Sequence, residues 1–238
     1  MSGAPVLAVR NLARAFGGVR AVDGVDFDVA RGEMVALIGP NGAGKTTCFN
    51  LVNGQLRADA GSVRLEGRDI GGLAPATIAR LRVGRTFQVA ATFVSMSVRE
   101  NIGVAQRALG RRGDARAADE LMACVGAPEL VDRHAAALAY ADAKRVELAV
   151  ALAGAPLLLL LDEPTAGLGP AERTPMMEAV RAATATGVAV LFTEHDMDVV
   201  FGFADRVIVL DRGRIIAMGI PEAVRADAAV RRAYLGEG

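Results

Sequence analysis

MVALIGPNGAGKTT, residues 34–47, joins a short apolar run to a loop rich in glycine. Met34–Ile38 has the length and composition of a buried strand, and the residues after the loop read as a helix that ends near Gly54. The phosphate-binding pattern GxxxxGK[ST] requires this context, because the N–H groups of the loop and the helix N-terminus then face phosphate oxygens. The alternative is a glycine-rich turn that matches by chance, which the flanking strand and helix disfavour. The stretch therefore predicts an α/β fold built around a nucleotide site.

The residues of this loop have separate expected roles. Its glycines allow the backbone to curl so that its N–H groups point at the phosphates. Lys45 is expected to reach the β- and γ-phosphates, Thr46 to place its hydroxyl on Mg²⁺, and Thr47 to lie near the α-phosphate. The expected nucleotide-binding residues of the stretch are Gly39, Pro40, Asn41, Gly42, Ala43, Gly44, Lys45, Thr46 and Thr47.

The composition predicts a globular protein without a strong overall field. The 238 residues include 27 basic and 27 acidic side chains, so no net charge favours nucleic acid or an anionic surface. Hydrophobic residues make up 52% of the chain, but its longest apolar run, 148–161, contains Gly154 and Pro156 and is too short to span a membrane. The first residues lack a signal-peptide pattern. Cys48 and Cys124 show no spacing typical of zinc or disulfides, which fits a reducing compartment.

Strand and helix patterns alternate in a way that indicates the fold class. Short strand patterns occupy most of residues 1–70, and residues from about 97 to 155 are rich in alanine, arginine and leucine and read as helical. Strand patterns return at Leu157–Leu161, Val188–Thr193 and Val207–Met218. Apolar strands separated by helical stretches predict an α/β fold with a mostly parallel sheet covered on both faces. The helical middle is expected to project from this sheet as a subdomain.

LLLLLDEP, residues 157–164, places two acidic residues after a fully apolar strand. The carboxyl ends of strands are where open α/β sheets bind ligands. Asp162 is suited to hold Mg²⁺ through water, and Glu163 to polarise an attacking water. Alone, such a pair is more often a helix cap or a surface turn. The phosphate loop in the same chain favours the functional interpretation.

A third apolar strand, Val188–Phe192, leads into the polar residues Thr193-Glu194-His195-Asp196. His195 is therefore expected to contact the γ-phosphate and to sense its loss, whereas His134 reads as structural or merely exposed. Gln88, in RTFQ, is a neutral amide that can touch both metal and water at the start of the helical region. From spacing alone Gln88 would be an ordinary surface residue.

Five stretches of the chain, in the order GPNGAGKTT, RTFQ, LAYADAKR, LLLLLDEPTAG and TEHDM, have about the spacing seen in ATP-binding-cassette (ABC) transporter ATPases. The resemblance covers essentially the whole chain. AFGGVRAVDGVDFDV, GRTFQ and FTEHDMDVVFGFADRVIVLDRGRIIAMG look most like the ATPase subunits of branched-chain amino-acid-type importers. This resemblance implies a P-loop ATPase core with an N-terminal antiparallel β part, forming one domain over residues 1–238. It also implies that residues 89–155 are an inserted helical signature subdomain.

The resemblance assigns further roles to individual residues. It implies that Phe16 stacks on adenine, although the sequence alone would equally allow a core phenylalanine. Gln88 becomes a metal-contacting residue in the loop that couples nucleotide state to the membrane subunits. Glu163 becomes the catalytic base, and His195 the switch histidine. ATP and Mg²⁺ are the implied cofactors.

LAYAD, residues 138–142, aligns with the signature LSGGQ of this family, because Leu138 precedes Asp162 by 24 residues. In these ATPases the signature caps the nucleotide of the opposite subunit with a serine hydroxyl, glycine backbone and a helix N-terminus. Ala139 stands in place of the serine, and Ala141 and Asp142 also depart from the pattern. The stretch resembles a weakened signature that serves another chain's ATP. The alternative is that this subfamily tolerates such changes without functional loss.

The function implied by the resemblance is ATP binding and hydrolysis that power an importer of branched-chain or related amino acids. The implied partners are transmembrane permease subunits, a second ABC ATPase subunit in a homo- or heterodimer, and indirectly a periplasmic solute-binding protein, but no nucleic acid. The implied location is peripheral, on the cytoplasmic face of the inner membrane. Alternatives are another small solute (amide, urea or carboxylate), a non-transport ABC ATPase acting on DNA or ribosomes, and a P-loop kinase. A kinase would not explain TEHDM or the signature spacing.

Overall fold

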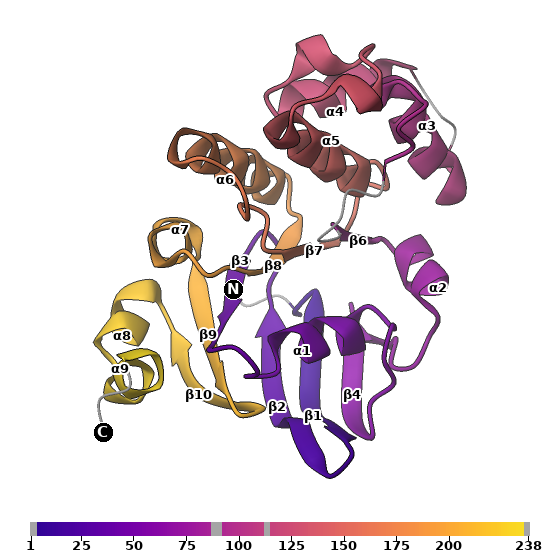
Figure 1. Ribbon diagram of the computed structural model, residues 1–238. Helices are drawn as coiled ribbons and strands as arrows, with labels where there is room; N and C mark the ends of the chain where they lie inside the picture. The colour runs from indigo at the N-terminus through magenta and orange to yellow at the C-terminus, as the bar shows by residue number, and fades with distance from the viewer. Residues whose placement is uncertain (1–3, 87–91, 112–114, 236–238) are drawn as a thin grey trace.

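A six-stranded sheet forms the centre of the protein in a computed structural model that describes residues 4–86, 92–111 and 115–235. Its strand order is β10-β9-β3-β8-β7-β6, and all neighbouring strands are parallel except the β9–β10 hairpin. The strands are β3 (Met34–Ile38), β6 (Val83–Arg85), β7 (Leu158–Asp162), β8 (Ala189–Thr193), β9 (Arg206–Asp211) and β10 (Arg214–Gly219). Because β3, β7 and β8 are parallel neighbours, their carboxyl ends lie at one edge of the sheet (Figure 1).

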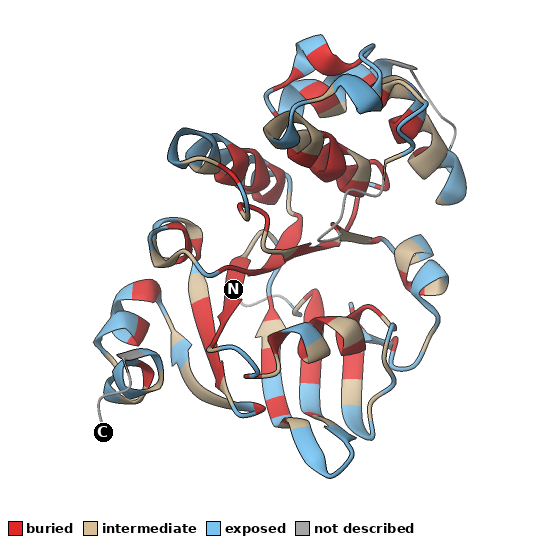
Figure 2. Cartoon of the chain, viewed as in Figure 1, coloured by how far each residue is buried: buried red, intermediate tan, exposed pale blue. Residues whose placement is uncertain are grey.

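The central strand β3 shows why these apolar runs form the middle of the sheet. Met34, Ala36 and Ile38 pack into the hydrophobic core on one face, and Val35 and Leu37 into a second core on the other face. All of them are fully buried, and Figure 2 shows the same burial in the neighbouring strands. A strand that is apolar on both faces is stable only between two covering layers.

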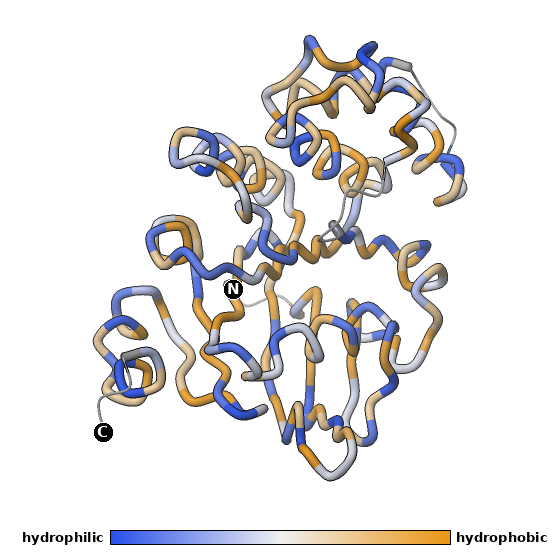
Figure 3. Tube along the Cα trace, in the orientation of Figure 1, coloured by the Kyte–Doolittle hydropathy of each residue, from blue (hydrophilic) through white to orange (hydrophobic). Residues whose placement is uncertain are grey.

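An antiparallel sheet forms the N-terminal part of the molecule, as predicted. Its strand order is β2-β1-β4-β5. The strands are β1 (Leu7–Phe16), β2 (Val19–Val29), β4 (Ala60–Leu65) and β5 (Arg68–Asp69). The helix α1 (Lys45–Val52) packs into the core that this sheet shares with the parallel sheet. Figures 1 and 3 show α1 beside the antiparallel sheet, whose strands alternate between hydrophobic and hydrophilic residues.

Helices cover the opposite face of the parallel sheet. A group of three, α3, α4 and α5, projects at one end of the molecule, while α6 and α7 follow the strands β7 and β8 (Figure 1). Their bounds are α3 (Val98–Ala108), α4 (Ala115–Cys124), α5 (Tyr140–Leu152), α6 (Pro170–Ala185), α7 (Met197–Phe203), α8 (Pro221–Ala226) and α9 (Ala228–Leu235). Short 3-10 turns lie at Pro128–Leu130 and Ala135–Ala137, between α4 and α5. Apolar residues of all seven helices join the core on this face.

The sequence patterns missed the elements between residues 66 and 86. The helix α2 (Pro75–Arg80) and the strands β5 and β6 lie there. These elements are two to six residues long. Such short segments carry no readable hydrophobic period, so tertiary contacts decide their conformation. The strand β6 matters for the site, because it pairs with β7 and leads toward Gln88, which lies outside the described residues.

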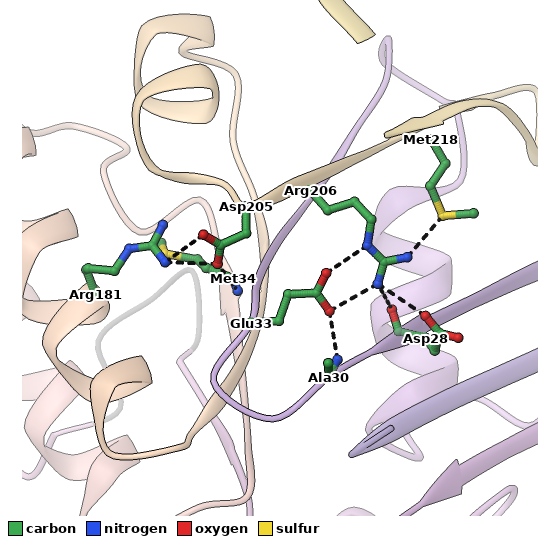
Figure 4. Close-up of polar contacts among 8 residues, drawn as sticks. All are labelled: Asp28, Ala30, Glu33, Met34, Arg181, Asp205, Arg206 and Met218. Carbon is green, nitrogen blue, oxygen red and sulfur yellow. Dashed lines mark hydrogen bonds and ion pairs between the residues drawn. The ribbon is translucent and has the colours of Figure 1, made fainter. Parts of the chain in front are cut away.

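Two arginine clusters hold the amino ends of β3 and β9 together, at the edge opposite the predicted site (Figure 4). Arg206 donates to Glu33 at 2.8 Å and to the Asp28 backbone carbonyl at 2.7 Å, which ties the two sheets together. The hydrogen bond with Glu33 is the main cause of the raised pKa of Arg206. Asp205 accepts from the backbone N–H of Met34 at 2.8 Å and also pairs with Arg181. These contacts stabilise the scaffold away from the candidate site.

Candidate functional site

The loop between β3 and α1 has a shape that requires glycine at two positions. Gly39 has a φ of 156°, and a Cβ there would lie 2.2 Å from the Leu210 carbonyl oxygen. Gly44, which caps α1, has a φ of 106°, and a Cβ there would lie 2.2 Å from the Ala21 carbonyl oxygen. A side chain at either position would clash with backbone atoms. The glycine pattern is therefore explained by close packing against β9 and β2.

Lys45 begins α1 and folds back over this loop. Its ammonium donates to the carbonyl oxygens of Gly39 at 2.6 Å and Pro40 at 3.1 Å. Burial lowers the pKa of Lys45, while the charges of Glu163 and Asp162 act in the opposite direction. The lysine is thus held at the mouth of the loop, near both acidic residues predicted for the site.

A cavity of about 230 Å³ brings three of the predicted stretches together. Its lining residues are Ala21, Asn41, Gly42, Ala43, Gly44, Lys45, Thr46, Thr47, Glu163 and His195. The loop residues come from the β3–α1 connection, and the last two come from the ends of β7 and β8. Residues more than a hundred positions apart in sequence therefore share one cavity at the carboxyl edge of the parallel sheet.

Glu163, the second residue of the acidic pair, contacts the histidine directly. Glu163 follows the last residue of β7, and its Oε1 lies 2.9 Å from Nε2 of His195. Glu163 has a φ of 51°, in the left-handed region that a glutamate rarely adopts. Its carboxylate is about a quarter exposed and the imidazole about half exposed, so both can meet a ligand in the cavity.

Asp162 is held by two residues, Thr193 and Arg85, that lie outside the predicted set of site residues. Its Oδ1 accepts from the Thr193 hydroxyl at 2.7 Å, and its Oδ2 lies 3.9 Å from an Arg85 nitrogen. Arg85 also donates to Asn50 in α1 at 3.2 Å, and burial is the main cause of its lowered pKa. In the sequence, Thr193 could have been recognised as a site residue because it is a polar residue directly after an apolar run. Arg85 could not have been recognised in this way, because the strand that carries it, β6, is only three residues long and shows no clear sequence pattern.

The donor set around the loop fits a magnesium ion. Thr46 and Asp162 offer a hydroxyl and a carboxylate, which are the hard oxygen donors that Mg²⁺ prefers. The described residues contain no cluster of three or more His, Cys, Asp or Glu side chains that could hold a metal by themselves. Mg²⁺ usually takes only one or two protein carboxylates and fills its remaining positions with water and phosphate oxygens. Gln88, the other predicted metal contact, lies outside the described residues.

Phe16 and LAYAD lie outside the lining of this cavity. Phe16 ends β1, is 43% exposed, and has the guanidinium carbon of Arg14 4.9 Å from its ring centroid. Ala139 is the N-cap of α5 and makes no side-chain capping bond. The hydroxyl of Tyr140 donates to the Ala166 carbonyl at 3.1 Å, so this stretch contacts the segment that follows Glu163.

Comparisons with known proteins agree with this geometry. Residues 22–166 match the family model for the ABC transporter, and residues 214–238 match the model of a branched-chain amino acid ATP-binding cassette transporter. The chain is 39% identical to the high-affinity branched-chain amino acid transport ATP-binding protein LivG of Salmonella typhimurium, with 98% of each chain covered. It is also 39% identical to BraF of Pseudomonas aeruginosa, a protein of the same description, again with 98% of each chain covered.

Solved structures give the same result. An ATP-binding cassette of an ABC transporter in its ADP conformation has a TM-score of 0.88 at 31% identity, covering 99% of this chain and 100% of the other. A nucleotide-free cassette gives the same score at 31% identity, with 98% and 100% covered. The chain therefore belongs to the ABC transporter family, among its ATP-binding and ATP-hydrolysing subunits. In the described residues, no helix combines the length and apolar character needed to cross a bilayer.

Proposed function

We propose that this chain is the ATP-hydrolysing subunit of an importer that takes up branched-chain or related amino acids through separate membrane subunits. The observation that supports an ATP site best is the single cavity lined by the glycine loop, Glu163 and His195. The named relatives and the match at residues 214–238 support the solute class. Another small solute is the alternative, because solute contacts belong to other subunits.

The first step of the proposed mechanism is phosphate binding. The N–H groups of the loop and the N-terminus of α1 bind the phosphates, and Lys45 leaves its loop carbonyls to contact the β- and γ-phosphates. Thr46 and Asp162 are the described residues that would hold Mg²⁺, with Gln88 as a further ligand. The ion, when bound, neutralises charge on the β- and γ-phosphate oxygens. Phe16 is proposed to stack on the adenine.

The second step is hydrolysis. Glu163 polarises a water for attack on the γ-phosphate, and the Thr193 hydroxyl keeps Asp162 in one orientation beside it. We propose that the imidazole of His195, whose Nε2 lies 2.9 Å from Oε1 of Glu163, hydrogen-bonds the γ-phosphate. His195 is therefore the residue proposed to sense the loss of that phosphate.

Membership of the family supports a set of proposed partners. We propose that residues 1–238 act as one ATP-binding domain and that residues 89–155 form its helical subdomain, which docks on a permease subunit. Gln88 would couple that surface to the metal. A second ATPase subunit completes the dimer, a periplasmic solute-binding protein acts indirectly, and the complex works at the cytoplasmic face of the membrane. Heat protection of the associated binding protein by candidate solutes tests the proposed solute.

Glu163→Gln tests the proposed chemistry. The variant keeps the lysine, the loop and the metal ligands, so ATP affinity should change by less than about threefold, while hydrolysis should fall by at least about 100-fold because water activation is lost. Nucleotide binding and steady-state phosphate release measure the two effects. Glu178→Gln makes the same chemical change at an exposed position of α6 and serves as the control. Parental turnover by Glu163→Gln would remove its assigned role.

A further inference from the structure

Four consecutive residues, the last of β8 and the three that follow it, each contact a different residue between the end of β7 and the first turn of α6. The contacting pairs are Thr193–Asp162, Glu194–Thr165, His195–Glu163 and Asp196–Arg173. Two of these pairs involve residues of the proposed site. The Glu194–Thr165 pair has no role in the proposed chemistry, although Glu194 lies between Thr193 and His195 in sequence.

Glu194 is a buried carboxylate that accepts three hydrogen bonds. Its Oε1 accepts from both the backbone N–H and the hydroxyl of Thr165, each at 2.7 Å, and its Oε2 accepts from the N–H of His195 at 3.2 Å. Glu194 is 4% exposed and Thr165 is 3% exposed. A carboxylate is costly to bury unless its oxygens accept hydrogen bonds. These donors therefore fix the carboxylate between the loop after β7 and the loop after β8.

The backbone of Glu163 has an unfavourable conformation that neighbouring hydrogen bonds must hold in place. Its φ of 51° is unfavourable for a residue with a side chain, and such a conformation persists only when its surroundings hold it. On one side, the N–H of Glu163 lies 3.1 Å from the Thr193 hydroxyl and 3.2 Å from the Thr193 carbonyl oxygen. On the other side, Thr165 is anchored by Glu194. The backbone is thus held both at Glu163 and two residues beyond it.

We propose that Glu194 is a positioning residue for ATP hydrolysis. Its carboxylate holds Thr165, and through Thr165 the strained backbone of Glu163, so that the Glu163 carboxylate stays in contact with His195. The inference rests on the proposed roles of Glu163 and His195. It adds that the reaction depends on a buried carboxylate that lies outside the lining of the candidate nucleotide cavity.

Kinetic constants of the full-length chain test this role. Glu194→Ala should lower kcat by about 10- to 100-fold, because a small displacement of a reacting group is enough for such a loss. Its ATP affinity should stay within about threefold of the parental value, since Lys45 and the glycine loop are untouched. Glu194→Gln keeps an oxygen that accepts both Thr165 donors, so it should recover most of the lost kcat.

Asp205→Ala provides a matched control. Asp205 also accepts a backbone N–H and contacts an arginine, but it lies at the opposite edge of the sheet (Figure 4). Its loss should lower the melting temperature and leave kcat unchanged. If Glu194 had only a structural role, Glu194→Ala would likewise lower the melting temperature and leave kcat unchanged.

The imidazole of His195 gives a second readout. The chain has two histidines, so His134 serves as an internal reference in nitrogen-15 spectra. Glu194→Ala should shift the ring-nitrogen resonances of His195, because the contact with Glu163 changes, while those of His134 stay in place. Neither resonance should move in Asp205→Ala.

The outcomes separate this inference from the proposed function. Parental kcat in Glu194→Ala, or an unshifted His195 resonance, overturns the role of Glu194 when Glu163→Gln is inactive in the same assay. Parental turnover by Glu163→Gln instead removes the proposed role of Glu163, on which this inference rests. Absence of ATP hydrolysis by the parental protein in its assembled complex overturns the proposed function itself. If Glu194→Ala fails to fold, Thr165→Val tests the same contact. This variant keeps the backbone N–H donor to Glu194 and loses the hydroxyl donor. A kcat lowered by about 3- to 10-fold supports the inference, and a parental kcat overturns it.

Discussion

At the residue scale, the backbone of the site is determined by steric limits as much as by chemistry. Gly39 and Gly42 both have positive φ values, of 156° and 80°. They differ in what surrounds them, because a Cβ at Gly39 would meet the Leu210 carbonyl oxygen at 2.2 Å, whereas a Cβ at Gly42 would meet nothing within 4 Å. Gly39 is therefore required by close packing against backbone atoms, whereas Gly42 is required only by its positive φ.

This difference predicts unequal costs for the same substitution. Gly42→Ala should lower the free energy of unfolding by about 1–3 kcal/mol, from backbone strain alone. Gly39→Ala should cost clearly more, since the β3–α1 loop must also move away from β9. Chemical denaturation of the two variants measures the difference. Equal losses of stability would mean that the loop relaxes freely around Gly39.

At the scale of single elements, the ends of two helices differ in how their first N–H groups are satisfied. α3 begins with a capping box, in which Ser97 accepts from the N–H of Glu100 and Glu100 accepts from the N–H of Ser97. α5 begins at Tyr140, and the methyl side chain of its N-cap residue, Ala139, cannot accept a hydrogen bond. Helix N-termini lose stability when such donors remain without a side-chain acceptor.

The two caps give a matched pair of substitutions. Ala139→Ser should raise the free energy of unfolding by about 0.5–2 kcal/mol, and Ser97→Ala should lower it by a similar amount. Both changes follow from one hydrogen bond to a helix N-terminus. Thermal or denaturant unfolding of the full chain measures them. No gain from Ala139→Ser would indicate that α5 is already capped by another group.

At the scale of the whole molecule, the two cysteines differ in their exposure to solvent. Cys48, in α1, is fully buried, and its burial raises the pKa of its thiol to about 12. Cys124, at the end of α4, is exposed. A thiol-selective reagent near neutral pH should therefore modify Cys124 alone in the native protein, and both cysteines after unfolding. Mass spectrometry with and without denaturant tests this. Rapid native labelling of Cys48 would contradict the compact core around α1.

The assembled transporter should also reveal the consequence of LAYAD. We predict that the chain pairs with a different ATPase whose signature contains serine, so that the cavity of this chain becomes the faster site. Glu163→Gln should then remove most ATPase activity, and the matching change in the partner should matter less. A missing hydroxyl contact to phosphate costs about 1.5–3 kcal/mol, or roughly 10- to 100-fold in rate.

Measurement of both glutamine variants beside Ala139→Ser in the reconstituted complex tests this asymmetry. Restoring the serine should raise the rate at the slower site. Equal losses from the two glutamine variants, with no gain from the serine, would mean that LAYAD is a competent signature. The heterodimer prediction would then be wrong.

Local patterns in the sequence were sufficient for the elements and for part of the site. The apolar run Met34–Ile38, the glycine loop and the acidic residues after β7 each follow from chemistry within a few neighbouring residues. The α/β class followed from the alternation of strand and helix patterns, whereas the antiparallel N-terminal part and the family were implied by the resemblance of five stretches to ABC transporter ATPases. The structure and the comparisons confirm all three. The roles of individual site residues remain predictions.

Only the tertiary structure decided which polar side chains meet. Thr193 and Glu194 were visible as polar residues after a strand, but their partners Asp162 and Thr165 lie 31 and 29 positions away. Arg85 reaches Asp162 from β6, a strand too short to recognise. Hydrophobic periodicity specifies which face of an element is buried, so the sequence by itself determined the layers. The pairing of polar groups depends on strand order and on distances between distant segments, which no local pattern contains.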